Sequence, residues 1–392
     1  MRSRRYIGVM SIATVLLMVM AAFAAVPGAG TSDGKTEYVV LFKDTIDEQV
    51  VKDNNGKINK AFSLIPAVVT KITAKDAKNL EKSDNVKAVE ENYIYYAAPG
   101  KSQKKPQPPP PEPDPQVTPW GVDRIDAEEA WTTTKGDGIT VAVIDTGIDK
   151  DHPDLETNII GGRNYVVIKR KIDPNKWDDD NGHGTHCAGI IAALDNDEGV
   201  VGVAPGASLY AIKVLNKRGS GFMSDVIAGI EHATYEGVDV ISMSLSGPDS
   251  TSLADAVAAA ISGGIVVVAA AGNYADDPVE YPAYYTGVIG VGATASTDVL
   301  ASFSNYGVGL DIVAPGVAIY STYKGGGYTT MSGTSMACPH VAGTVALVLA
   351  SGGSVDDIYD TADWPTYYSE EYYGNGLLDA EEAVTGYQTG DN

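Results

Sequence analysis

The stretch "MSGTSMACPH", Met331 to His340, places one hydroxyl group, that of Ser335, among small residues. A long apolar run follows directly and predicts a helix. A serine hydroxyl is a poor nucleophile at neutral pH unless a neighbouring base takes its proton. If this stretch carries chemistry, its partners must come from other parts of the chain.

Outward from this helix, short apolar runs alternate with helical stretches from Thr118 onward. The runs are "ITVAVIDTG", "ASLYAIKVL", "VDVISMSLS", "GIVVVAAAGN" and "TGVIGVGA". Such near-continuous apolar runs are typical of strands buried on both faces of a sheet. Because "HGTHCAGIIAAL" and "SDVIAGIEHATYEG" predict helices between them, we expect a parallel α/β sheet over residues 118–392.

Polar residues end several of these runs, among them Asp145, Ser244 and Asn273. In parallel α/β sheets ligands bind at the carboxyl ends of the strands. The triplet "DTG" at Asp145 is ambiguous, because it could be a simple turn or half of an aspartic-protease site. The second interpretation needs two carboxylates sharing a proton, and the chain has no second triplet of this kind.

"NGHGTHCAG" places His183 at a glycine-flanked helix start. It could be a helix cap, or a metal site with His186, although no third ligand lies at useful local spacing. Asn273, after "AAAG", could form a turn or donate to an oxyanion. Together the stretches supply an orienting acid, a base, an oxyanion donor and a hydroxyl.

The sequence resembles the subtilisin-like serine proteases, a family known for the order Asp, His, Ser. The matching stretches are "AVIDTGID", "NGHGTHCAGIIAA", "GVAPGASLYAIKVL", "ISMSLSG", "VVVAAAGN" and "GTSMACPHVAG". The resemblance implies a doubly wound, mostly parallel sheet and a serine endopeptidase acting through an acyl-enzyme. It assigns Asp145, His183 and Ser335 as catalytic triad and Asn273 as oxyanion donor. A catalytically silent peptide-binding relative is the alternative.

Composition agrees with an exported enzyme. The 392 residues include 44% hydrophobic residues and carry a formal net charge of −23, which argues against nucleic acid or an anionic membrane as partner. Residues 1–25 read as a secretory signal, with basic "MRSRR", an apolar run and the cleavage site Ala22-Phe23-Ala24. A membrane anchor is the alternative, but the run is short for a span. We expect a secreted monomer.

Two segments precede the predicted enzyme. Residues 36–98 alternate like strands around one helical stretch and predict a small α+β unit, which looks like the inhibitory pro-region of the family. Residues 99–117 are rich in proline and predict an exposed, cleavable linker. We therefore expect a self-processed zymogen whose pro-region is its intramolecular inhibitor. Alignment with the family places the self-cleavage junction near Ala97 or Ala98, and with the lysines that follow we expect cleavage somewhere from Ala97 to Lys105.

The resemblance also implies a groove for polypeptide substrates. Its edges are "SLSG" and "RGSG", and the residues assigned to it are Ser244, Leu245, Ser246, Gly247, Gly219, Ser220 and Gly221. Glu280 falls where family members line the bottom of the main specificity pocket, and a carboxylate there favours Lys or Arg before the scissile bond. An exposed loop glutamate is the alternative. The alanines at the expected junction suggest a small residue instead.

Calcium is the implied structural ion, and no organic cofactor is expected. The assigned oxygen ligands are Gln116, Asp154, Leu194, Asn196, Glu198 and Val200. The acidic run "WDDDNG" could bind a second ion or be a solvated face. Cys187 and Cys338 are the only cysteines, and we expect two buried thiols rather than a disulfide. A cysteine-protease reading is disfavoured because neither thiol occupies a matched nucleophile position.

Overall fold

The structure is a computed structural model that describes residues 34–98, 115–168, 171–365 and 369–386. The predicted signal segment 1–25 and nearly all of the predicted linker 99–117 lie outside the described residues.

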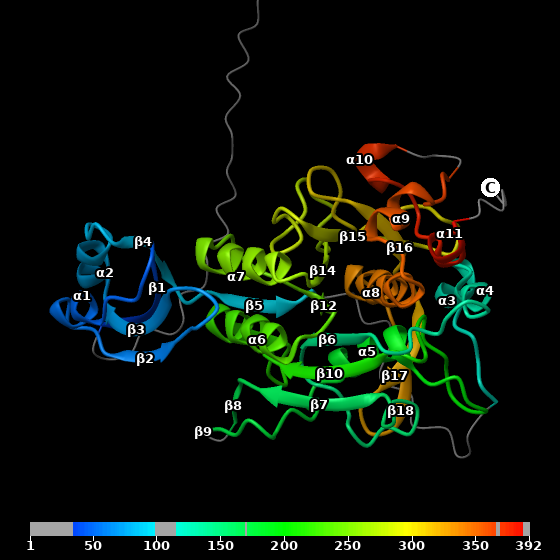
Figure 1. Cartoon of the computed structure of the whole chain (residues 1–392), viewed down its shortest axis with the longest axis horizontal. Helices are drawn as coiled ribbons and strands as arrows, with labels where there is room; N and C mark the ends of the chain where they lie inside the picture. Colours follow the sequence, from blue (N-terminus) through cyan, green and yellow to red (C-terminus); the bar gives the residue numbers. More distant parts are fainter. Residues whose placement is uncertain (1–33, 99–114, 169–170, 366–368, 387–392) are drawn as a thin grey trace, which may run out of the picture.

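The N-terminal module is a four-stranded antiparallel sheet with strand order β2-β3-β1-β4 and two short helices. It has its own apolar core, in which Val40, Phe42 and Leu80 are fully or almost fully buried. Figure 1 shows it at one end of the molecule. Its elements are β1 (Lys35–Phe42), α1 (Glu48–Asp53), β2 (Ile58–Ala61), β3 (Ala67–Thr73), α2 (Ala74–Leu80) and β4 (Val86–Glu91).

The larger part is built on a seven-stranded sheet of order β16-β15-β14-β12-β6-β10-β7, and every neighbouring pair in it is parallel. Val141 and Val143 of β6 enter one core, and Ala142 and Ile144 enter the other. The predicted doubly wound α/β fold is therefore confirmed. The strands are β6 (Thr140–Asp145), β7 (Ile159–Asn164), β10 (Ser208–Lys213), β12 (Val240–Met243), β14 (Val266–Ala270), β15 (Val288–Thr294) and β16 (Ile312–Pro315).

Helices cover both faces of this sheet (Figure 1). Helices α5 (His183–Ala192) and α8 (Thr334–Ser351) pack into one core, and α6 (Met223–Glu236) and α7 (Thr251–Ser262) pack into the other. Among the described residues only α8 is long and apolar enough to cross a membrane, and 83% of it is buried inside the protein. Shorter helices are α3 (Trp120–Arg124), α4 (Ala127–Ala130), α9 (Val355–Asp360), α10 (Glu370–Tyr373) and α11 (Ala380–Thr385).

Strand β6 lies where the winding of the sheet reverses, because β10 flanks it on one side and β12 on the other. Ligand sites of open parallel sheets lie beyond the carboxyl ends of the strands at such a point. Asp145 is the last residue of β6, so the fold itself presents this carboxylate there.

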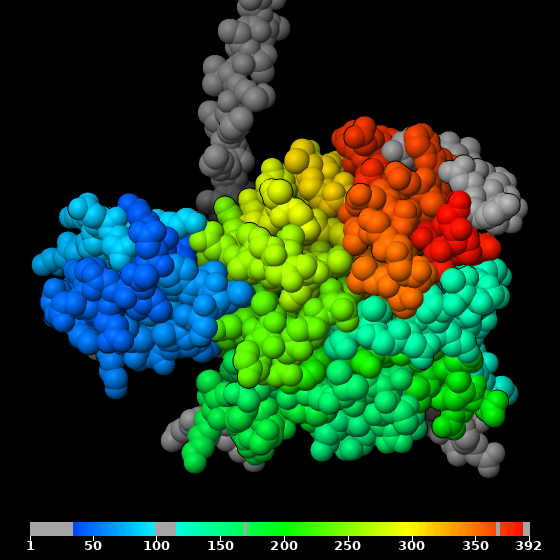
Figure 2. All heavy atoms as spheres, viewed as in Figure 1, coloured from blue at the N-terminus to red at the C-terminus, as the bar shows by residue number. Residues whose placement is uncertain are grey.

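The module reaches the larger part through one extended strand, β5 (Ile94–Ala97). This strand lies between β11 (Ser220–Phe222) and β13 (Leu245–Ser246) and is antiparallel to both. Figure 2 shows the module as a lobe resting against the larger part. Two hairpins complete the fold: β8 (Val167–Ile168) with β9 (Lys171–Ile172), and β17 (Ile319–Tyr323) with β18 (Gly327–Met331).

Candidate active site

Asp145 and His183 form a buried pair at the carboxyl end of β6. The imidazole Nδ1 lies 2.9 Å from both carboxylate oxygens of Asp145. Asp145 is fully buried and His183 is only 6% exposed. Burial alone favours the neutral imidazole, but the Asp145 charge outweighs it and the pKa of His183 lies well above its usual value. The pair holds one tautomer of the ring and leaves Nε2 without a protein partner.

The loop before His183 is organised by Asp179. One carboxylate oxygen of Asp179 accepts from the backbone N–H groups of Asn181 and Gly182, and the other accepts from the N–H and hydroxyl of Thr185. Gly182 has φ 113°, a conformation that favours glycine, and precedes the first residue of α5. The acidic run predicted as an ion site or a solvated face thus contains the residue that shapes the histidine loop.

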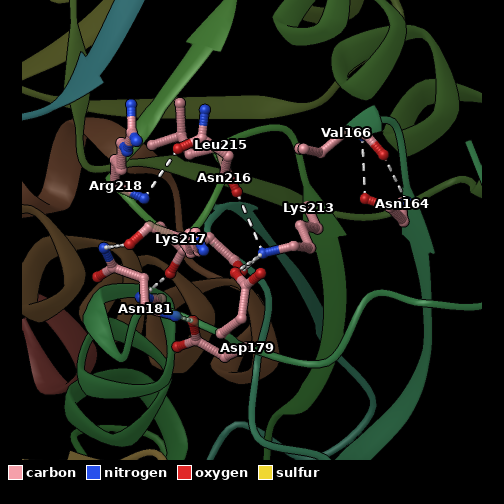
Figure 3. A network of polar contacts seen from close by, with 12 residues as sticks. Asn164, Val166, Asp179, Asn181, Lys213, Leu215, Asn216, Lys217 and Arg218 are labelled. Atoms are coloured by element: carbon pink, nitrogen blue, oxygen red, sulfur yellow. Dashed lines mark hydrogen bonds and ion pairs between the residues drawn. The ribbon is translucent and has the colours of Figure 1, made fainter. Parts of the chain in front are cut away.

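Lys213 is fully buried and joins three segments of the site. Its ammonium donates to the carbonyl oxygen of Thr146, to that of Leu215 at 3.2 Å, and to the Asp180 carboxylate at 2.6 Å. Figure 3 shows this side chain reaching from β10 toward the loop that carries Asp179. Lys213 therefore ties the end of β6, the histidine loop and the segment leading to β11 into one unit.

Ser335 lies in the first turn of α8 and is fully buried. Its hydroxyl donates to the carbonyl oxygen of Ala98 at 2.8 Å, with that of Ser244 as a second acceptor at 3.3 Å. The first turn of a helix has free backbone N–H groups and a positive dipole end, which stabilise a nearby negative charge. Ser335 thus faces a peptide carbonyl in surroundings that favour an oxyanion.

Cys187 connects the histidine and serine segments. Its Sγ lies 3.9 Å from Nδ1 of His183 and donates to the carbonyl oxygen of Ser335 at 3.4 Å. Burial raises the pKa of Cys187, and it raises that of Cys338 to about 12. Both cysteines are free and buried, so the prediction of two thiols rather than a disulfide is confirmed.

Asn273 is oriented by the residue next to Ser335. Its side-chain oxygen accepts from the backbone N–H of Thr334 at 2.9 Å, with the Thr334 hydroxyl at 3.3 Å. Its amide nitrogen, Nδ2, is buried and has no partner. An unpaired buried donor is costly unless it serves a ligand, so this N–H₂ group is available for a negative oxygen beside Ser335.

The predicted groove edges are the two strands that flank β5. Ala97 donates its N–H to the carbonyl oxygen of Gly219 at 2.8 Å, and Ala98 donates to that of Ser244 at 3.1 Å. In the registers, Ser220 and Gly221 oppose Tyr96 and Tyr95 on one side, while Leu245 and Ser246 oppose Ala97 and Tyr96 on the other. The chain's own segment therefore lies in the groove as an extended strand.

Glu280 is not an exposed loop residue. Its Oε2 is buried without a partner, and the side chain lies beside Ser246 of the groove. Burial raises the pKa of this carboxyl group. A buried carboxyl group next to the groove, with Oε2 free of a partner, can receive a cationic substrate side chain.

The residues predicted to bind calcium lie together, apart from the triad. Asp154 is fully buried, and its carboxylate accepts from the Asn196 amide at 3.0 Å and the Val200 N–H at 2.9 Å. The Gln116 amide lies 3.3 Å from the carbonyl oxygen of Leu194, and the Glu198 N–H donates to the Asn196 side chain. Burial, opposed by these neutral partners, raises the pKa of Asp154 to about 6.

The two other histidines near the site have structural surroundings. Burial lowers the pKa of His186 to about 3 and that of His340 to about 4. His186 Nε2 lies 3.1 Å from the carbonyl oxygen of Thr329, and His340 Nδ1 lies 2.7 Å from that of Met336. Neither ring pairs with a carboxylate, in contrast to His183.

Sequence reasoning missed Asp179, Lys213 and the orienting role of Thr334. For two of them, Lys213 and Asp179, the sequence contains a feature that could have pointed to the role. A lysine at the end of the otherwise apolar strand "SLYAIK" must find buried partners, and Asp179 lies four positions before the histidine. The sequence contains no such feature for Thr334, because its partner Asn273 is 61 positions away.

Comparison with known proteins agrees with this architecture. Residues 136–360 match the description "Subtilase family". The chain is 39% identical to subtilisin J of Geobacillus stearothermophilus and to subtilisin E of Bacillus subtilis (strain 168), with 98% of this chain and 100% of each relative covered. It is 40% identical to the thermostable alkaline protease of Halalkalibacterium halodurans, over 97% of this chain and 99% of that protein. The chain therefore belongs to the subtilase family.

Proposed function

We propose that the protein is a serine endopeptidase that hydrolyses polypeptides through an acyl-enzyme. One observation carries the proposal: an extended segment lies between β11 and β13, with its Ala98 carbonyl oxygen 2.8 Å from the Ser335 hydroxyl. In this position the carbonyl carbon is within reach of the serine oxygen. The Asp145–His183 pair supplies the base that such an attack requires.

In the proposed mechanism each group of the site has a defined role. His183 takes the Ser335 proton through Nε2, the nitrogen left open by the pairing of Nδ1 with Asp145. The serine oxygen attacks the carbonyl carbon, and the developing oxyanion accepts from Asn273 Nδ2 and the Ser335 N–H. His183 then passes the proton to the leaving amine, and a water molecule repeats the sequence to release the acyl group.

A catalytically silent peptide-binding relative would share the groove but not the reactivity. A serine-directed phosphonate distinguishes the two functions, because it bonds covalently only to an activated hydroxyl. We expect labelling of active wild-type protein at Ser335 and none of Ser335→Ala, as detected by intact mass. Absence of labelling from wild type whose groove is free would leave only the binding function.

We further propose that the chain is secreted as a zymogen. Residues 1–25 would be the export signal, 36–98 the inhibitory pro-region, 99–117 the linker and 118–392 the catalytic domain. Support comes from β5, which fills the groove and so blocks access of other peptides. The test is the mass and N-terminal sequence of wild-type protein beside Ser335→Ala. Loss of the pro-region from wild type alone supports self-processing, and equal trimming of both assigns it to another protease.

Glu280 supports a preference for Lys or Arg in the residue before the scissile bond. The carboxylate lies beside Ser246 and lacks a cationic partner. Charge-assisted pairing with a substrate cation would satisfy it. Comparing peptides with Lys or Ala at that position, on wild type and on Glu280→Gln, tests this. A Lys preference that survives in Glu280→Gln would assign the selectivity elsewhere.

We also propose structural calcium at Gln116, Asp154, Leu194, Asn196, Glu198 and Val200. The donor set fits, because it offers carboxylate, amide and carbonyl oxygens, the ligands that Ca²⁺ prefers. Asp154 in particular is a buried carboxylate whose recorded partners are all neutral. Chelation should lower the unfolding temperature of wild type but not that of Asp154→Asn. Equal unfolding temperatures with and without chelator would refute the site.

A further inference from the structure

We propose that the groove recognises the hydroxyl group of a tyrosine, and so prefers Tyr over Phe, at the fourth residue before the cleaved bond. This proposal rests on the proposed peptidase function. The residue concerned is Tyr95, three positions before Ala98, whose carbonyl oxygen meets the Ser335 hydroxyl.

The Tyr95 side chain is the largest fully buried side chain of the described residues. Its ring packs against Gly247, where an added Cβ would come within 2.6 Å of the ring. Tyr95 belongs to the same buried apolar core as Leu215, Met223 and Leu245. The ring therefore occupies a closed apolar pocket that begins at the backbone of the groove.

The polar end of this pocket fits a hydroxyl. The Tyr95 hydroxyl donates to the carbonyl oxygen of Pro248 and lies beside the hydroxyl of Tyr285. Tyr285 is itself held in place, because its hydroxyl donates to the carbonyl oxygen of Ser250 and accepts from the Ser250 N–H, both at 2.9 Å. The Tyr285 hydroxyl beside that of Tyr95 is therefore held by the backbone of Ser250.

A phenylalanine would fill the same apolar volume but leave the Pro248 carbonyl without its donor. A covered polar group without a partner costs more free energy than one hydrogen bond contributes. Sites that hydrogen-bond a substrate hydroxyl consequently reject the analogue that lacks it. We expect about a 10-fold lower kcat/KM for Phe than for Tyr at this position.

The neighbouring residue, Tyr96, provides a matched control. Successive side chains of a strand point to opposite sides, and Tyr96 is 44% exposed while Tyr95 is fully buried. Removing the Tyr96 hydroxyl makes the same chemical change in the same strand without touching the pocket. It should alter kcat/KM by less than about twofold, the range of exposed substitutions.

The first experiment compares three p-nitroanilides on the active wild-type enzyme: Ile-Tyr-Tyr-Ala-Ala, Ile-Phe-Tyr-Ala-Ala and Ile-Tyr-Phe-Ala-Ala. The first peptide has the sequence of residues 94–98. The second lacks the hydroxyl of Tyr95, and the third lacks the hydroxyl of Tyr96. A loss of kcat/KM confined to the second peptide supports the proposal. Equal values for the first two peptides, or an equal loss with the third, would overturn it.

The second experiment needs no turnover. In the full chain carrying Ser335→Ala, the N–H groups of Ala97 and Ala98 donate to the groove edges, so their hydrogen exchange reports docking of the segment. Tyr95→Phe should speed this exchange about 10-fold, and Tyr96→Phe should leave it unchanged. If none of the three peptides is cleaved, the proposed peptidase function is wrong. The hydrogen-exchange measurement would still test whether the groove recognises the Tyr95 hydroxyl. Equal exchange in the two variants would refute the recognition itself.

Discussion

Charged groups behave differently in two regions of this protein. At the carboxyl end of β6, Asp145, His183 and Lys213 are nearly or fully buried and each has a charged partner. Where the N-terminal module meets α6 and α7, the ion pairs are partly exposed: the side chains of Lys60 and Asp225 are 27% and 13% exposed. Lys87 pairs with Asp255 at 2.6 Å, with side-chain exposures of 42% and 32%.

The difference bears on how firmly each region holds its geometry. Buried charges that lose a partner are strongly destabilising, so the site around β6 holds one geometry. Half-exposed pairs contribute little and are screened by salt. The module is therefore held mainly by the extended segment β5 and by apolar contacts, since Val39 and Leu41 share a buried core with Met223 of α6.

The largest effect is expected when the buried pair of Asp145 and His183 is broken. Asp145→Asn keeps the shape of the side chain but no longer stabilises the protonated His183, and kcat should fall about 10⁴-fold, the order of loss known when the triad aspartate of a serine protease is replaced. The exposed Asp151 gives the control, since Asp151→Asn should leave kcat unchanged. Steady-state kinetics on a peptide substrate measures both, and similar losses in the two variants would contradict the assignment of Asp145.

Next in size is the loss of the buried ammonium. Lys213→Met releases Thr146, Leu215 and Asp180 together, and the misplaced site should lose about 10²-fold in kcat with a smaller change in KM. The exposed Lys217 provides the matched variant Lys217→Met, which should be near wild type. Lys213→Met should also lower the unfolding temperature. Wild-type kcat in Lys213→Met would show that the site holds its geometry without this contact.

The segment that joins the two regions contains an unusual bond. The carbonyl facing Ser335 belongs to Ala98, and residue 99 is a proline. A prolyl nitrogen carries a ring carbon where other residues carry hydrogen, which crowds the proton transfer from His183 to the leaving nitrogen. Pro99→Ala should therefore speed self-processing at this bond at least about tenfold.

The time course of the intact mass measures the rate of self-processing at this bond, with Ser335→Ala as the unprocessed reference. A mature N-terminus elsewhere, at unchanged speed in Pro99→Ala, would show that another bond is the junction.

The pH dependence of the buried pair gives a smaller, graded effect. His183 acts as a base only when neutral, and its pKa is raised above the ordinary 6.5 because the Asp145 charge outweighs burial. kcat/KM should then fall about tenfold per pH unit below that pKa and level off above it. Asp145→Asn removes the raising charge and should move this acid limb to lower pH. A limb at or below 6.5 in wild type would contradict the coupling.

The smallest expected effect concerns the module contact. Glu90 accepts from the N–H groups of Thr251 and Ser252 at 2.7 and 2.9 Å, and so adds an anion at the N-terminus of α7. Glu90→Gln should speed release of the processed module about threefold at low salt, and less in high salt. The rate at which activity appears after processing measures this. Glu91→Gln, for which no bond to α7 is recorded, is the control.

Much of the fold and part of the site could be predicted from local patterns. Apolar runs gave the strands, and the doubly wound sheet follows from their alternation with helices. Asp145 and Asn273 are recognisable as polar residues that end apolar runs of the sequence. The roles of the acidic run before His183 could not be predicted from the sequence. Only the contacts in the structure show that Asp179 shapes the loop and that Asp180 pairs with Lys213.

By itself, the sequence determined the periodicity of each element, the glycine-flanked start of α5 and the order of the reactive residues, since these depend on neighbours along the chain. The tertiary structure decided which groups meet. The Ser335 hydroxyl faces a carbonyl 237 positions away, and the Tyr95 hydroxyl donates to a carbonyl 153 positions away. Such contacts depend on how separate elements pack in three dimensions, and no local pattern encodes them.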